Sequence, residues 1–121
     1  MTGERLKRDL LTKLINARID LAAYLQLRKA KGYMSVSESE HLRDNLFELC
    51  NFMREKAPTL KAKYGESELI ALRRAAEVLS IAGVCLMNGR HDCPNFIAVN
   101  AEKLENCLTT LSLCIMCLNE H

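Results

Sequence analysis

The stretch from residue 67 to residue 87 places the strongest constraint on what this chain can fold into. Apolar residues recur along it at intervals of three and four, which is the spacing of one face of an α-helix. This face consists of Leu69, Leu72, Ala76, Leu79, Gly83 and Leu86. After residue 77 the charged residues stop, so the second half of the helix is apolar on every side. A helix of this kind is normally enclosed by others, which predicts that residues 67–87 form the central helix of an all-α protein.

Two further segments have long helical periodicity with recognisable ends. Residues 4–31 contain neither Pro nor Gly, and Gly32 supplies the expected C-terminal stop. Residues 100–119 repeat apolar side chains at helical spacing, and Asn100 is a suitable N-cap. Both segments therefore predict long helices.

The remaining helix is expected over residues 37–57. Ser37 and Glu40 form an S-x-x-E capping box at its start, and Pro58 is expected to end it. Residues 59–65 then read as a basic connection with one helical turn at most.

The predicted fold is a compact antiparallel four-helix bundle formed by one domain, residues 1–121. The chain has only two prolines and five glycines, and 49% of its residues are hydrophobic, which favours long helices around a real core. Residues 88–95 are the most loop-like segment. Residues 96–99 fit a short strand, an apolar loop or an early helical turn, and the pattern does not separate these.

The compartment is predicted from apolar runs and cysteines. No apolar run approaches the ~20 residues that a membrane span needs, and the N-terminus has no signal-peptide pattern. Six cysteines without an export signal are typical of reduced thiols. We therefore expect a cytoplasmic protein that does not associate with membranes.

Apolar outer faces predict self-association. In a four-helix monomer every helix has an outer face, which should be polar. Ile81 and Val84 in the third predicted helix, and Leu113 and Met116 in the last, extend the apolar character behind the core stripes. We predict a homodimer through these four residues or through the first helix. The alternative is a bundle that encloses residues 67–87 unusually well.

Three other side chains are candidates for binding a partner protein. Phe47 and Phe52 lie off the apolar stripe of their helix, where they either contact a partner or are covered by a second helix. Arg18 projects from the broad apolar arc of the first helix. Its stem either lies along apolar surface with the head in water, or its head forms a pair between helices or subunits.

Thiol and imidazole groups raise the question of a metal site or a thiol-dependent activity. Cys114 and Cys117 form a C-x-x-C pair, and His91 and Cys93 lie in the 88–95 loop. Four such ligands can close a structural zinc site. However, the C-x-x-C pair lies inside an apolar helix, so we expect neither metal nor cofactor. No catalytic motif is recognisable, and we expect a protein that is not an enzyme.

Charge supports one further alternative. The formal net charge is only +2, but residues 1–31 hold eight of the Lys and Arg residues and three of the acids. A nucleic-acid contact would use basic residues of the first helix and the 59–65 connection. These residues are Arg5, Arg8, Lys13, Lys61 and Lys63.

These patterns favour a small non-catalytic regulator or adaptor that binds another protein through a helical surface. The first alternative is a nucleic-acid-associated factor that uses the basic N-terminal helix. The second is a metal- or thiol-dependent activity at the 88–95 loop.

Overall fold

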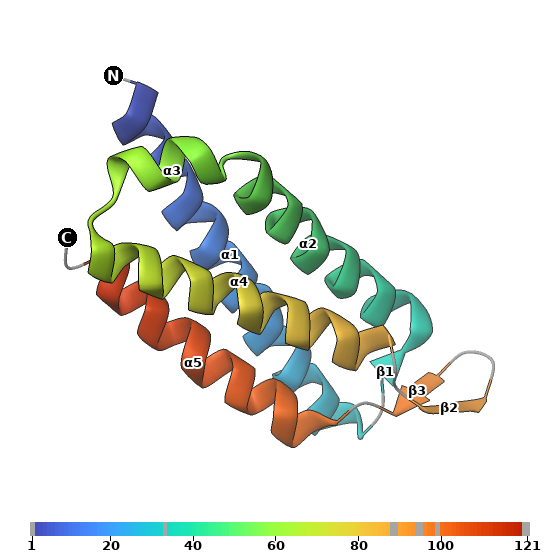
Figure 1. Ribbon diagram of the computed structural model, residues 1–121. Helices are drawn as coiled ribbons and strands as arrows, with labels where there is room; N and C mark the ends of the chain where they lie inside the picture. The colour runs from blue at the N-terminus through green and yellow to red at the C-terminus, as the bar shows by residue number, and fades with distance from the viewer. Residues whose placement is uncertain (1, 33, 88–89, 94–95, 99, 120–121) are drawn as a thin grey trace.

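Helices make up most of the chain in the computed structural model, which describes residues 2–32, 34–87, 90–93, 96–98 and 100–119 (Figure 1). These residues form five helices and three short strands. The helices are α1 (Thr2–Lys31), α2 (Val36–Glu55), α3 (Ala57–Lys63), α4 (Glu66–Met87) and α5 (Ala101–Asn119). The all-α class predicted from the sequence is confirmed.

The four long helices lie side by side, and α3 lies across one end of them (Figure 1). α4 packs along α2 and α5, and α1 packs along the same two helices. The central position of α4 therefore stays a prediction, because α1 and α4 have equivalent neighbours. None of the helices in the described ranges is both long enough and apolar enough to cross a membrane.

Leucines at helical spacing fill the space between these helices. Each long helix contributes at least one side chain that is less than 2% exposed. These leucines are Leu10, Leu14, Leu21, Leu46, Leu79, Leu104 and Leu111. Burying each one contributes about 1.5–3 kcal/mol. The predicted stripe of residues 67–87 is buried at Leu72, Leu79, Gly83 and Leu86, whereas Leu69 and Ala76 are half-buried.

Two predicted helix ends are confirmed by their hydrogen bonds. Gly32 adopts a positive φ of 82°, and its N–H donates to the Arg28 carbonyl, which ends α1. At the start of α5, the Lys103 N–H donates to Asn100 Oδ1 at 3.0 Å, so Asn100 is the N-cap.

The N-cap of α2 lies two residues before the predicted one. The cap is Ser35, whose Oγ accepts from the Glu38 N–H at 3.0 Å and donates to Glu38 Oε1 at 2.8 Å. The predicted capping pair of Ser37 and Glu40 was wrong. Both pairs fit S-x-x-E, but Ser35 is fixed by the strand that ends there, so the helix begins directly after it.

A small antiparallel sheet lies at one end of the long helices (Figure 1). Its strands are β1 (Met34–Ser35), β2 (Arg90–Cys93) and β3 (Phe96–Ala98), in the order β1-β3-β2. Residues 96–98 are therefore a strand, one of the three possibilities left open. The prediction of a loop over residues 88–95 was wrong for β2, because pairing with β3 orders it. Val99 lies outside the described residues.

Pro58 does not end α2 as predicted. α2 ends at Glu55, and Pro58 lies in the first turn of α3, where its missing N–H breaks no helical hydrogen bond. The segment expected to be a connection thus contains a short helix. Leu60 and Tyr64, which are 3% and 9% exposed, hold it in place, and the Lys7 ammonium lies 4.6 Å from the Tyr64 ring centroid.

Candidate functional site

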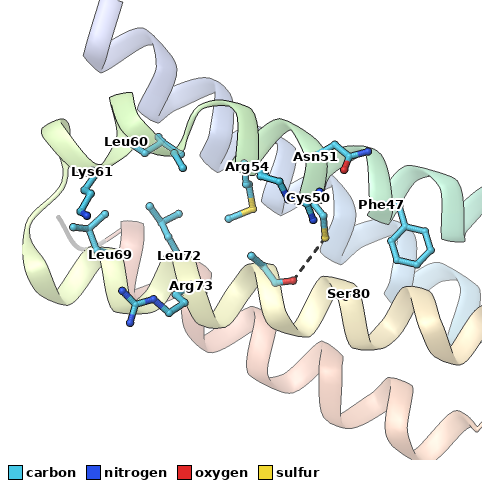
Figure 2. A pocket seen from close by; sticks show the side chains of 13 residues that line it. Phe47, Cys50, Asn51, Arg54, Leu60, Lys61, Leu69, Leu72, Arg73 and Ser80 are labelled. Atoms are coloured by element: carbon cyan, nitrogen blue, oxygen red, sulfur yellow. Dashed lines mark hydrogen bonds between the residues drawn. The ribbon is translucent and has the colours of Figure 1, made fainter.

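A cavity of about 610 Å³ opens between α2, α3 and α4 (Figure 2). Its size lies within the ~300–1,000 Å³ range of small-molecule sites. Most of its wall is apolar, and this part includes Phe47, Met53, Leu60, Leu69, Leu72 and Ala76. α3 connects α2 to α4 and contributes Ala57, Leu60 and Lys61 to the lining of the cavity.

Three cations stand at the rim of this cavity, one from each helix. They are Arg54 of α2, Lys61 of α3 and Arg73 of α4, and all three are exposed. No carboxylate of the described residues lines the cavity. The two ion pairs found in the described ranges, Lys31–Glu38 and Arg43–Asp44, involve none of the three cations. The cavity therefore combines an apolar wall with a positive rim.

The lining of this cavity favours binding of a ligand. Cys50 supplies its thiol, which donates to the Ala76 carbonyl at 3.7 Å. Burial raises the pKa of Cys50, and the opposing effect of Arg54 is smaller. The group is thus a protonated thiol at neutral pH, which is a poor nucleophile. No histidine lines the cavity among the described residues.

The sequence pattern does not indicate this cavity. Of the three cations at its rim, only Lys61 was a predicted site residue, as a nucleic-acid contact. The sequence has a basic residue in each of the three consecutive segments that form α2, α3 and α4. These residues come together only through the position of α3, and that segment was expected to be a connection.

A second candidate surface is the apolar outer face of α4 and α5. The four residues predicted for self-association are all exposed: Ile81 at 38%, Val84 at 43%, Leu113 at 61% and Met116 at 58%. Ile70, also exposed, lines one groove with Leu113. The alternative, that the bundle encloses α4 unusually well, was wrong, because Ile81 and Val84 on its outer side are exposed to solvent in a single chain.

These exposed residues do not form one patch. Ile81 lies 11 positions beyond Ile70 on α4, which is about 16 Å along the helix axis. Arg74 and Glu77, both exposed, occupy the stretch between them. The α4–α5 face, defined here by Ile70, Arg74, Glu77, Ile81, Val84, Leu113 and Met116, therefore has apolar ends and a charged middle.

The three residues predicted to bind a partner protein lie on different sides of the molecule. Phe47 is half-buried and lies against Gly83 of α4, and Phe52 is half-buried under Lys13, whose ammonium is 5.0 Å from the ring centroid. Neighbouring helices thus cover both rings in part. Arg18 is exposed, and its Nε donates to Ser112 Oγ of α5 at 2.8 Å, so its head joins two helices through a hydroxyl.

The basic residues of the nucleic-acid alternative are partly brought together. α1 packs against α3, so Arg5 and Arg8 lie at the same end of the molecule as Lys61 and Lys63 (Figure 1). Lys13 lies further along α1, over the Phe52 ring.

The thiol and imidazole residues are separated. β2, which contains His91 and Cys93, lies at one end of the helices, and α5 runs from that end to the other (Figure 1). Cys114 is 13 positions into α5, about 20 Å along its axis. Burial raises the pKa of Cys114. The His91 and Cys93 side chains lie outside the described residues.

Comparison with known proteins gives one consistent result. A family model described as "Biofilm formation protein (YliH/bssR)" matches residues 1–121. Proteins named "Biofilm regulator BssR" from Escherichia coli strain K12 and from Shigella flexneri are each 57% identical to this chain over 121 residues. The match covers 100% of this chain and 95% of each relative. No solved structure matches the chain.

Proposed function

Because this chain belongs to the YliH/bssR family of biofilm formation proteins, we propose that it is a non-catalytic regulator of biofilm formation. It acts as a cytoplasmic adaptor that binds proteins through its helical surfaces. The name of its relatives supports the regulatory role. Free thiols at Cys50, Cys85, Cys107, Cys114 and Cys117 are consistent with a reducing compartment.

The observation that carries this proposal is the exposure of large apolar side chains on the α4–α5 face. Single exposed apolar residues are normal on a protein surface. We infer an interaction site here because two separate groups of them lie on two adjacent helices, on either side of the charged middle of the face. Ile81, Val84, Leu113 and Met116 are all between 38% and 61% exposed.

We assign this face to a second copy of the chain. A two-fold interface uses the same patch on both subunits, so the patch must be complementary to itself. The α4–α5 face meets this condition because it contains Arg74 and Glu77 between its apolar ends. Antiparallel pairing of two α4 helices would bring the cation of one copy toward the anion of the other.

Sedimentation velocity tests the assignment. The full chain should sediment as a dimer, and the double variant Leu113→Glu/Met116→Glu should sediment as a monomer with unchanged helical circular dichroism. The control Thr12→Glu/Gln26→Glu adds the same charge at two exposed positions of α1 and should remain a dimer. A wild-type monomer at all accessible concentrations would remove the self-association proposal.

A nucleic-acid-associated factor is the second candidate. It is favoured by the common end that Arg5 and Arg8 share with Lys61 and Lys63. Binding to double-stranded DNA should then weaken steeply with salt, and replacing these residues with Gln should flatten that dependence. Absence of binding at low salt would exclude it.

A further inference from the structure

The cavity between α2, α3 and α4 has no role in the proposed self-association, yet its wall has a distinct polarity. In Figure 2, Lys61 and Arg73 lie at the end where Leu69 lies, and Phe47 lies at the opposite end. Between these ends the wall is formed by buried apolar side chains such as Met53 and Leu72. The cavity therefore has two cations at one end and a mostly apolar wall along its length, with Arg54, Cys50 and Ser80 as polar side chains between the two ends.

The charges at this end are unbalanced. Within the described ranges, Lys61 and Arg73 make no ion pair, and no Asp or Glu lines the cavity. Arg54 adds a third positive charge to the rim. Three like charges around one apolar opening favour an anionic occupant, because an anion there gains charge-assisted hydrogen bonds.

We propose that this cavity binds a small amphipathic carboxylate. Its carboxylate group meets Lys61 and Arg73, and its apolar body lies along Leu72 and Met53 toward Phe47. The volume of about 610 Å³ suits a small molecule. A purely anionic metabolite would leave the apolar wall unused, and a neutral apolar molecule would gain no charge-assisted hydrogen bond from the cations at the rim. The site would make the protein responsive to a small molecule, independently of self-association.

Isothermal titration calorimetry with decanoate, below its critical micelle concentration, tests the proposal on the full chain. Decanoate should bind with one molecule per chain, and decanol, which has the same apolar body without the charge, should bind about tenfold more weakly or worse. The variant Lys61→Gln/Arg73→Gln should weaken decanoate binding about tenfold or more and leave decanol binding unchanged.

A matched control separates the local site from general charge. Lys29→Gln/Lys103→Gln removes two exposed positive charges from α1 and α5, away from the cavity, and should bind decanoate as the wild type does. An equal loss in this control would show unspecific electrostatic attraction and would overturn the proposal. Absence of any decanoate heat in the wild type would overturn it as well.

Cysteine alkylation locates the ligand. Cys50 lines the cavity, whereas Cys117 lines the groove between α4 and α5. Saturating decanoate should slow the reaction of Cys50 with iodoacetamide, measured by peptide mass spectrometry, and leave the rate at Cys117 unchanged. Slowing at both cysteines, or at neither, would place the ligand elsewhere and contradict the assignment.

Discussion

Replacing Gly83 with Ala should destabilise the protein through one ring of the neighbouring helix. A Cβ atom at residue 83 would lie 2.6 Å from Cε1 and 2.7 Å from Cζ of Phe47. Carbon atoms in contact prefer about 3.5–4.0 Å, so the ring must move by about 1 Å. Gly83 thus allows α2 and α4 to approach at this point.

Two opposing effects set the magnitude. Ala in place of Gly in a helix interior contributes about 1 kcal/mol, and overpacking a helix contact costs about 1–3 kcal/mol. We expect a net loss of about 1 kcal/mol in the free energy of unfolding for Gly83→Ala. In a Phe47→Ala background the steric cost disappears, and the same change should stabilise the protein by about 1 kcal/mol. The coupling between the two positions is then about 2 kcal/mol.

Urea denaturation of the four proteins, at one fixed protein concentration, measures this cycle. A fixed concentration is needed because self-association makes the apparent stability concentration-dependent. If Gly83→Ala stabilised the protein equally in both backgrounds, Phe47 would not lie over Gly83, and the contact between α2 and α4 would be incorrect.

Two further predictions concern the core and the start of α2. Leu79→Asp should abolish the folded state, since Leu79 is 1% exposed and an unpaired charge there costs several kcal/mol; a soluble variant with unchanged helical circular dichroism would contradict this. The hydrogen bond from Ser35, followed by the one from Lys31, lowers the pKa of Glu38 from its ordinary value of 4.5. A carboxyl group whose pKa is lowered by folding stabilises the fold at pH values above its pKa in the unfolded chain. This contribution is lost as the pH falls through its pKa in the folded protein. Glu38→Gln should therefore reduce stability at pH 7, by about 0.5 kcal/mol or less for so exposed a pair, and match the wild type in urea denaturation once the pH lies well below the folded pKa of Glu38; an equal deficit at both pH values would contradict the linkage.

Much of the fold could be predicted because helical periodicity is a local property. Leu10, Leu79 and Leu111 are buried because their spacing puts them on one face of each helix, and Gly32 and Asn100 end or begin helices through their own backbone and side-chain chemistry. These features need no knowledge of distant residues.

The features of the fold that were not predicted depend on strand pairing between residues far apart in the sequence. Met34 pairs with Ile97 in the sheet, and that pairing selects Ser35 over Ser37 as the cap of α2. A two-residue strand has no periodicity of its own to detect. Pro58 is equally ambiguous, because it can follow one helix or open the next.

The candidate surfaces were predicted unequally for the same reason. The exposure of Leu113 and Met116 follows from their position behind the core stripe of one helix, so the sequence indicated it. The cavity joins Arg54, Lys61 and Arg73 from three helices, and only the position of α3 brings them together. Side chains from separate elements cannot be grouped by spacing.

If this regulator acts through its α4–α5 face, substitutions on that face should change biofilm mass in living cells. A strain lacking its own copy of the protein should be complemented with the wild type, with Leu113→Glu/Met116→Glu, and with the control Thr12→Glu/Gln26→Glu, at equal protein levels. We expect that the wild type and the control restore the parental biofilm mass and that Leu113→Glu/Met116→Glu does not. Full restoration by Leu113→Glu/Met116→Glu would contradict it.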